Sequence, residues 1–340
     1  MTANKRDKNC CIVVSHPFWR ERLGCGTLLR ARYNLLKSIF ANVYIFFITN
    51  TEEKCPYIGA TFRGFQPSNP DHLAASREFF EQNDISLCYF SYNLFSGLAE
   101  LINCTTVVEV HDVMHIRQAN FDKFGYSAPI KMDKTDEIKS LKKYDLVFCL
   151  NTVETAYLQK NGINCVFLPP NMDFNLINQP QDDSFFGFFG SSALPNIDGI
   201  KQVKSLISST DKFVIAGSIT RNLSSETVEK NCLKNLGFVE TPGTFYENIN
   251  VAISPIRFGA GLKIKVFEAL AHGCRVLASS HSIEGFPEGV ADIVTVNDNL
   301  SNWDLRAVEQ TLVTPRGSIE KYFSEHFSNK ICRNLLLQAL

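Results

Sequence analysis

The residues best suited to bind an anion lie between Ser254 and Phe286. This stretch reads SPIRFGAGLKIKVFEALAHGCRVLASSHSIEGF, a pattern that predicts a strand, a glycine loop, a helix and a second strand. Gly259 and Gly261 allow a tight turn and a close approach of a ligand to the backbone. The unpaired N–H groups and the dipole at the start of the helix favour an anion there. A phosphate site is therefore the chemistry that this stretch predicts.

Charged side chains surround the same loop. Arg257, Lys263 and Lys265 add positive charge to the predicted phosphate site. The spacing of Gly261, Lys265 and Glu268 predicts that these three residues share one helix face. A carboxylate at Glu268, further along the helix, is able to accept hydrogen bonds from both hydroxyl groups of a ribose. The alternative is a surface helix on which Lys265 and Glu268 form only a solvated ion pair.

A second polar group follows a strand in the first half of the chain. VVEVHDVMHIR places His111 and Asp112 at the end of a strand that reads as buried. In open α/β sheets, functional groups lie beyond the carboxyl ends of the strands. The alternative for His111 is a structural histidine that is bonded to the backbone. His16 likewise follows the first predicted strand, ahead of Gly24 and Gly26.

Short apolar runs alternate with longer amphipathic stretches along the chain, and these elements must position the candidate groups. Runs of strand type occupy residues 10–15, 43–49, 87–91, 106–110, 145–150, 165–170, 185–190, 212–217, 237–240, 251–255, 275–279 and 292–296. Helical patterns occupy residues 27–40, 152–159, 195–207, 223–234, 263–272 and 302–312. Such an alternation predicts parallel sheets that are covered on both faces.

The alternation restarts after a linker at residues 169–183 that is rich in Pro, Asn, Gln and Asp. A chain of 340 residues is long enough for two domains. We therefore expect an α/β protein with two Rossmann-like domains, residues 1–170 and 171–340, that face each other across a cleft. The ligands of such sheets bind beyond the carboxyl ends of the strands.

The composition excludes several classes of function. Lys and Arg number 34 against 35 Asp and Glu, so the basic surplus of a dedicated nucleic-acid binder is missing. The 11 cysteines show no CxxC pair and no zinc spacing with histidine, which favours buried free thiols and no metal site. The longest apolar stretch is too short to span a bilayer. We expect a cytoplasmic protein, with peripheral contact at the inner face of a membrane left open.

The stretch GAGLKIKVFEALAHG, followed by RVLAS and by Glu284-Gly285, resembles the donor-binding signature of glycosyltransferase family four (glycosyl transferases group 1), which has the GT-B fold. FFGFFGSSALPNIDGI and KFVIAGS resemble the opening strands of that family's donor domain. The resemblance covers about residues 184 to 297. It implies a retaining, metal-independent hexosyltransferase without a cofactor, which moves a sugar from a nucleotide-sugar to a glycan, lipid-linked or protein acceptor. It also implies a role in polysaccharide biosynthesis.

The resemblance assigns roles to individual residues of the donor domain. Glu268 would bind the donor ribose, and Lys263 or Lys265 would neutralise the diphosphate leaving group. Backbone amides for the sugar and the diphosphate would come from Gly259, Ala260 and Gly261. The end of a strand, at Phe238 and Val239, would lie near the base.

Two positions depart from the family pattern. Ala260 stands where many members carry a glutamate, so a carboxylate contact to the donor sugar is absent or replaced. The loop after the first donor-domain strand starts at Gly190 and lacks the usual Arg and Lys. Arg257 or Arg221 would then supply the missing positive charge. These departures leave the identity of the donor open.

The resemblance implies that the acceptor binds to the first domain. His111 would contact the donor sugar across the cleft, and Asp112 would orient His111. The loop with His16, Gly24 and Gly26 would help to admit the acceptor. The alternative for that loop is a plain turn into a helix that Thr27 caps.

Three other functions remain open. An NAD-dependent oxidoreductase predicts GxGxxG directly after the first strand, but the chain reads GCGTLL there. A sugar-nucleotide epimerase or phosphorylase on the GT-B scaffold would bind similar ligands without a separate acceptor. A non-catalytic subunit that binds nucleotide or glycan would fit the loss of the glutamate at Ala260. No DxD motif follows a predicted strand, which disfavours metal-dependent transferases of the other common fold.

Overall fold

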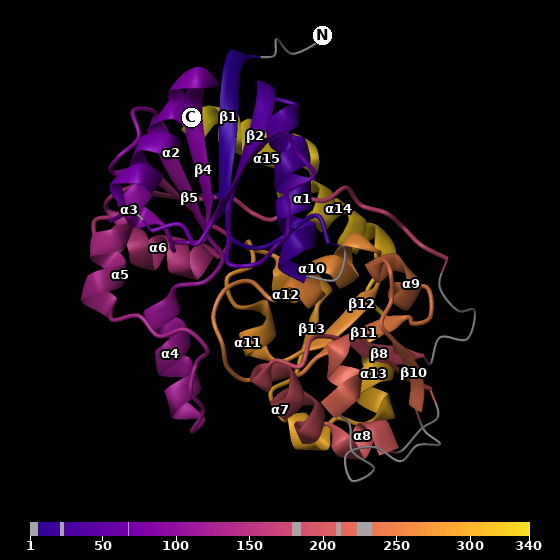
Figure 1. Ribbon diagram of the computed structural model, residues 1–340. Helices are drawn as coiled ribbons and strands as arrows, with labels where there is room; N and C mark the ends of the chain where they lie inside the picture. The colour runs from indigo at the N-terminus through magenta and orange to yellow at the C-terminus, as the bar shows by residue number, and fades with distance from the viewer. Residues whose placement is uncertain (1–5, 21–23, 67, 179–184, 209–211, 223–232) are drawn as a thin grey trace. The chain divides into compact units, whose positions relative to one another are not determined.

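The computed structural model describes residues 6–20, 24–66, 68–178, 185–208, 212–222 and 233–340 (Figure 1). The chain folds into two units, of which unit 1 comprises Met1–Ile116, Pro129–Asn171 and Cys332–Leu340. Unit 2 comprises Arg117–Ala128 and Met172–Ile331. Both units are Rossmann-like α/β structures, as the expected fold class requires.

Unit 1 is built on one parallel sheet of seven strands, in the order β3-β2-β1-β4-β5-β6-β7. The strands are β1 (Arg6–Val14), β2 (Phe40–Thr49), β3 (Gly59–Arg63), β4 (Ile85–Ser91), β5 (Thr105–Val110), β6 (Leu146–Cys149) and β7 (Cys165–Phe167). The helices are α1 (Gly24–Lys37), α2 (Pro70–Gln82), α3 (Ser96–Ala99), α4 (Met114–Lys123), α5 (Lys134–Leu141), α6 (Thr152–Lys160) and α15 (Asn329–Ala339). Residues from Arg117 of α4 belong to unit 2, as does the start of α15.

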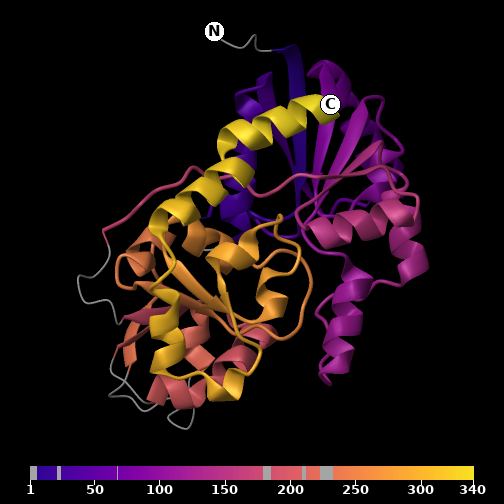
Figure 2. The ribbon, with the colours of Figure 1, turned by 180° about the vertical axis from the view of Figure 1, so that it is seen from behind.

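Two apolar clusters cover the two faces of this sheet. Successive side chains of a strand point to opposite faces, and β1 accordingly sends Cys11 and Val13 to one cluster and Ile12 and Val14 to the other. The end of α15 closes the second cluster with the fully buried Cys332 and Leu336. Figure 2 shows this helix lying against the sheet of unit 1.

Unit 2 repeats the design with six parallel strands, in the order β10-β9-β8-β11-β12-β13. The strands are β8 (Phe186–Phe189), β9 (Phe213–Ala216), β10 (Leu233–Gly237), β11 (Val251–Ser254), β12 (Arg275–Ala278) and β13 (Thr295–Val296). The helices are α7 (Leu194–Gln202), α8 (Lys204–Ser208), η1 (Ser218–Asn222), α9 (Pro242–Tyr246), α10 (Ile264–Ala271), α11 (Ser280–Ile283), α12 (Val290–Ile293), η3 (Leu300–Asn302), α13 (Leu305–Thr311) and α14 (Arg316–His326).

Two expected strands differ in position from the observed elements, and one expected helix lies largely outside the described residues. The strand expected at 237–240 is β10, which ends at Gly237 because this glycine turns to a φ of 62°. The helix expected at 223–234 falls largely outside the described residues, and its last positions overlap β10. The run at 292–296 begins in α12, and only Thr295 and Val296 form a strand. Across the described ranges, no helix has the length and the hydropathy that a bilayer crossing requires.

Candidate functional site

The glycine loop after β11 has the backbone that its sequence predicts. Gly259 has a φ of 124° and Gly261 a φ of 66°, conformations that favour glycine. Lys263 is extended and caps α10, which begins only at Ile264. Gly261 therefore lies before the helix, and the expectation that it shares a helix face with Lys265 and Glu268 is wrong. At its other end, α10 stops ahead of Gly273, which has a φ of 69°.

Lys263 supports the loop from inside. Its side chain is buried, and Nζ donates to the carbonyl oxygen of Gly261 at 2.9 Å and to that of Ala260 at 3.4 Å. Both partners are backbone groups of the glycine loop itself. The ammonium thus fixes the turn from which the loop presents its backbone.

Lys265, the second residue of α10, has different partners. Its Nζ donates to Oδ1 of Asn196 at 2.8 Å and lies 5.4 Å from the centre of the Phe188 ring. Burial and the nearby Lys263 lower the pKa of Lys265 to about 7, against a smaller opposing effect of Glu268. An ammonium with this pKa is readily held in the charged form by a bound anion.

Glu268 lies on the same helix and is buried, with 5% of the residue exposed. Burial raises its pKa to about 7, and Lys265 opposes this rise. The solvated ion pair that was the alternative for Lys265 and Glu268 is not present. A residue of α9 also holds the first turn of α10, because the Tyr246 hydroxyl donates a hydrogen bond to the carbonyl oxygen of Lys265.

Arg257 is held by an acidic partner that the sequence analysis did not identify. Its Nε and Nη2 donate to the two carboxylate oxygens of Asp198, at 2.8 and 2.6 Å. The guanidinium also lies 5.0 Å from the centre of the Phe124 ring. Nearby, Asn120 donates to the carbonyl oxygen of Gly259 at 2.7 Å. Phe124 and Asn120 come from Arg117–Ala128, the segment that belongs to unit 2.

The remaining candidate residues of unit 2 lie at the carboxyl ends of β8, β9 and β10. Gly190 follows β8, where a Cβ atom would stand 2.5 Å from the Phe188 ring. Arg221 is exposed in η1, after β9. Phe238 follows β10 and is 54% exposed, and Val239 is half-buried. Because β11 ends at the same edge of the parallel sheet, the structure brings these loops to the side of the glycine loop.

Hydrogen bonds join these loops to one another. Gly217 donates its N–H to the carbonyl oxygen of Gly237, and Ile219 donates to that of Gly190. Ser192 donates twice to Ser218, from its N–H to the hydroxyl oxygen and from its hydroxyl to the carbonyl oxygen. We call the glycine loop, Lys265, Glu268, Asn196 and the loop at Gly190 the glycine-loop site.

In unit 1, His111 lies after β5 and packs on aromatic and charged side chains. Its ring stacks on that of Tyr92 with 4.2 Å between centres, and Nε2 lies 3.2 Å from Oε1 of Glu109. The ring of His16 also contacts that of Tyr92, edge to face, with 5.7 Å between centres. Tyr92 has a φ of 70°, a strained conformation that clusters at functional sites when it occurs in a residue other than glycine. The structure thus brings His16 and His111 together around Tyr92, a neighbourhood that the sequence analysis did not predict.

A buried ion pair stands behind His111. The carboxylate of Glu109 accepts from Nε of Arg32 at 2.8 Å and from the hydroxyl of Tyr89 at 2.5 Å. Burial would raise the pKa of Glu109, but Arg32, His111 and Tyr89 together lower it to about 2. Glu109 therefore remains a carboxylate beside the imidazole. A charged residue within the apolar run TTVVEV was the signal that could have identified it.

His16 is kept neutral. Burial, and secondarily the neighbouring His111, lower the pKa of His16 to about 4. Its buried Nε2 makes no hydrogen bond with the described residues. Gly24 and Gly26 form the first turn of α1 rather than a loop, so Thr27 does not cap this helix. A Cβ atom at Gly26 would stand 3.0 Å from the carbonyl oxygen of Phe18, so glycine allows this close approach.

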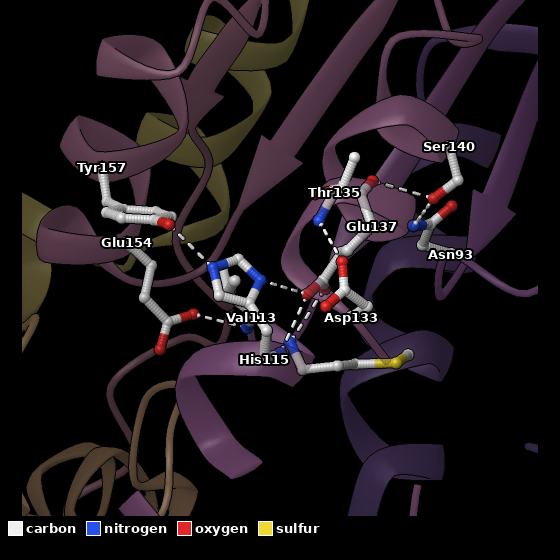
Figure 3. A network of polar contacts seen from close by, with 10 residues as sticks. Asn93, Val113, His115, Asp133, Thr135, Glu137, Ser140, Glu154 and Tyr157 are labelled. Atoms are coloured by element: carbon white, nitrogen blue, oxygen red, sulfur yellow. Dashed lines mark hydrogen bonds and ion pairs between the residues drawn. The ribbon is translucent and has the colours of Figure 1, made fainter. Parts of the chain in front are cut away.

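Two buried carboxylates anchor the backbone that follows Asp112, which is itself half-buried (Figure 3). Glu154 accepts from the N–H of Val113 at 2.9 Å, and Glu137 accepts from those of Met114 and His115. These bonds satisfy the N–H groups at the start of α4.

His115, the other histidine of this segment, belongs to the same anchor. Its ring contacts Glu137 at 2.6 Å and the hydroxyl of Tyr157 at 2.7 Å, as the dashed lines of Figure 3 mark. The network fixes the course of the chain directly after His111 and Asp112. Across the described ranges, no cluster of three or more His, Cys, Asp or Glu side chains is arranged to hold a metal ion.

Part of unit 2 is similar to a known protein family. Residues 186–309 match the family model described as glycosyl transferases group 1. An uncharacterized protein of Saccharomyces cerevisiae is 23% identical over 231 residues, which are 67% of this chain and 47% of that protein. The chain thus spans about half the length of this curated relative.

Solved structures share the fold over nearly the whole chain. Sucrose-phosphate synthase from Thermosynechococcus elongatus has a TM-score of 0.72 at 15% identity, over 97% of this chain and 98% of its own. HepE of Anabaena, solved with UDP and glucose, has a TM-score of 0.67 at 12% identity and the same coverage of both chains. These likenesses show that the chain has the GT-B fold, and residues 186–309 of unit 2 are similar to group 1 glycosyltransferases.

Proposed function

We propose that this chain is a glycosyltransferase that moves a sugar from a nucleoside diphosphate sugar to a glycan, lipid-linked or protein acceptor. The observation that carries the proposal is the glycine loop beside Lys265 and Glu268, within the stretch that matches group 1 glycosyltransferases. That HepE, which has a similar fold, was solved with UDP and glucose supports a nucleotide-sugar donor.

The donor binds in unit 2 through charge and backbone polarity. The N–H groups of the loop at Gly259, Ala260 and Gly261 and the start of α10 receive the diphosphate, with Lys265 as its cation. Glu268 accepts from the hydroxyl groups of the ribose, and the base lies along Phe238 and Val239. Fixed dipoles and an ammonium of this kind stabilise charge that develops on a leaving group.

The reaction retains the configuration of the sugar. The bond from the anomeric carbon to the diphosphate breaks, and a bond to the acceptor oxygen forms on the same face of the sugar. An oxygen of the leaving diphosphate takes the acceptor proton, so the step needs no nucleophile from the protein. His111 contacts the donor sugar, and Asp112 and Glu109 orient His111. Since Lys265 and α10 supply the positive charge, we expect turnover to persist in the presence of a chelator.

We place the protein in the cytoplasm, with peripheral contact at the inner face of a membrane where the acceptor is lipid-linked. The nine cysteines whose side chains the structure describes are free, which supports a reducing compartment. Synthesis of a polysaccharide is the setting that the resemblance to group 1 glycosyltransferases suggests.

A second candidate is a non-catalytic subunit that binds a nucleotide or a glycan. The observation that favours it is Ala260, which puts a methyl group where many related transferases carry a carboxylate. Both candidates use the same loop to bind a diphosphate, so binding alone does not separate them.

The test is release of nucleoside diphosphate from UDP-, GDP- and ADP-sugars, with and without glycan acceptors. We expect release from one donor class, increased by an acceptor and unaffected by EDTA. Binding of a nucleotide without any release would favour the non-catalytic subunit. Conversion of a donor into an isomeric nucleotide-sugar without an acceptor would favour an epimerase on the same fold.

A further inference from the structure

Asn196 connects two parts of the glycine-loop site. It lies near the start of α7 (Leu194–Gln202), and the residue is 7% exposed. Its Oδ1 accepts from Nζ of Lys265 at 2.8 Å. Its Nδ2 donates to the carbonyl oxygen of Ser191 at 2.9 Å and to the hydroxyl of the same residue at 3.2 Å. One amide thus joins the cation on α10 to the loop after β8.

The chemistry of the partners explains why this residue is an asparagine. An ammonium only donates hydrogen bonds, and a backbone carbonyl only accepts them. The partners therefore fix the amide with its oxygen toward Lys265 and its nitrogen toward Ser191. An aspartate would have no donor for Ser191 and would pair its negative charge with the ammonium. An amide orients the lysine and leaves its positive charge uncompensated.

The other two cations of the loop have different hydrogen-bond partners. Arg257 is paired with the Asp198 carboxylate through two hydrogen bonds. Lys263 donates to backbone carbonyl oxygens of the loop. Among the described residues, no carboxylate oxygen lies within ion-pair distance of Lys265. A neutral partner is what distinguishes Lys265 from Arg257.

We propose that Asn196 is a positioning residue, which holds the Lys265 ammonium at the glycine loop with its charge available for the diphosphate of the donor. This inference rests on the proposed function. It adds that two residues of α7 determine which cation binds the diphosphate. Asn196 leaves the charge of Lys265 available, whereas Asp198 neutralises that of Arg257.

The charges around Lys265 agree with this role. The groups that face it are Lys263, Glu268, the ring of Phe188 and the amide of Asn196. Burial and Lys263 lower its pKa to about 7, and Glu268 opposes them. A bound diphosphate would supply the missing negative charge and raise this pKa.

The experiment is a double-mutant cycle with Asn196→Ala, Lys265→Met and the double variant. Binding of UDP, GDP, ADP and inorganic pyrophosphate is measured by titration calorimetry at a fixed pH below 7 and fixed ionic strength. We expect Asn196→Ala to weaken binding about tenfold, the size of one hydrogen bond to a charged group. In the Lys265→Met background the same change should cost less than about twofold, because residues that act through one another are not additive.

Unit 2 offers a matched control. Asn248 accepts from Nζ of Lys234 at 2.6 Å and donates to the carbonyl oxygen of Thr244 at 2.8 Å, the same bridge on an exposed surface. Asn248→Ala should leave diphosphate binding unchanged. Circular dichroism of every variant identifies any that fails to fold.

A second variant gives a readout that a merely structural role would not move. Asn196→Asp places a carboxylate beside Lys265, so it should raise the pKa of this lysine, measured by NMR of its 13Cε resonance. The variant should also weaken diphosphate binding, because the ammonium is then paired.

The outcomes separate the inference from the proposed function. If Asn196→Ala weakens binding equally with and without Lys265, or if Asn196→Asp leaves the pKa of Lys265 unchanged, the positioning role is wrong and the proposed function stands. If the wild-type protein binds no nucleoside diphosphate and no pyrophosphate, the proposed function and this inference are both overturned.

Discussion

Asp198 accepts two hydrogen bonds from Arg257, one from Nε at 2.8 Å and one from Nη2 at 2.6 Å. The pair joins α7 to the loop after β11, and the Arg257 guanidinium also covers the ring of Phe124. The Asp198 side chain is 7% exposed, so Arg257 is needed to stabilise its buried negative charge. The charge of Arg257 is therefore used in an ion pair that stabilises unit 2.

Arg257→Gln should lower the free energy of unfolding by about 2 kcal/mol, because a buried carboxylate loses hydrogen bonds to a charged donor. Denaturant titration measures this loss. Asp198→Asn combined with Arg257→Gln should recover part of it, since an amide pair needs no charge. Affinity for a nucleoside diphosphate should change far less in Arg257→Gln than in Lys265→Met. Equal losses of affinity in these two variants would show that Arg257 also contacts the ligand.

Glu268→Ala should weaken binding of a nucleoside diphosphate about 10- to 100-fold, because two hydrogen bonds from the ribose to a carboxylate are lost. Binding of pyrophosphate, which has no ribose, should stay the same. Titration calorimetry with both ligands checks the difference. Glu288→Ala, an exposed position of the same unit, is the control. Loss of pyrophosphate binding in Glu268→Ala would indicate a damaged loop rather than a missing ribose contact.

The pKa values of Lys265 and Glu268 predict an unusual dependence of stability on pH. Glu268 has a folded pKa of about 7, above that of a free glutamate. Between these two pKa values the folded state binds more protons than the unfolded state, so stability falls as pH rises toward 7. Lys265 also has a folded pKa of about 7, below that of a free lysine. Above pH 7 the unfolded state binds more protons, so stability rises again. Together the two groups lower stability most near pH 7 in the ligand-free protein.

The double variant Lys265→Met with Glu268→Gln removes both titrations. Its free energy of unfolding relative to wild type should be most favourable near pH 7 and less so at pH 5 and pH 9. Urea titrations across this range provide the measurement. A difference that does not vary with pH would contradict the burial of the two charges.

The Arg32–Glu109 pair behind His111 should be costly to break. Arg32→Met leaves the Glu109 carboxylate buried without its main partner, and we expect a loss of about 3–5 kcal/mol. Arg32→Met with Glu109→Leu should cost less than this single change, because no charge then remains buried. Thermal and urea denaturation test the order of the two variants. A double variant less stable than Arg32→Met would mean that packing, and not charge, dominates here.

The sheets were predictable because their strands are buried on both faces. Runs such as the one in β2 (Phe40–Thr49) are apolar almost throughout, which is the pattern of a central parallel strand. β3 (Gly59–Arg63) was missed because it is an edge strand that alternates between exposed and half-buried residues. β10 was misplaced because its sequence, LKNLG, has little apolar content.

The site was predictable in its loop and not in its partners. Gly259, Gly261 and the lysines form a contiguous motif, so their local geometry follows from the chain. Asn196 and Asp198 lie 69 and 59 residues from Lys265 and Arg257, and only the folded sheet brings them together. Glu109 is a lone charge in an apolar strand, and its partner Arg32 comes from α1. Spacing along the sequence carries no information about such contacts.

The central claim, a nucleoside diphosphate site at the glycine loop, is tested most directly by thermal stabilisation with UDP, GDP, ADP, CMP and NAD. A ligand that binds the folded state stabilises it by about 2.7 kcal/mol at a hundredfold excess over its dissociation constant. We predict a rise of the melting temperature with one nucleoside diphosphate in the wild type, and a smaller rise in Lys265→Met. A rise with NAD alone, or the same rise in Lys265→Met, would contradict the site described here.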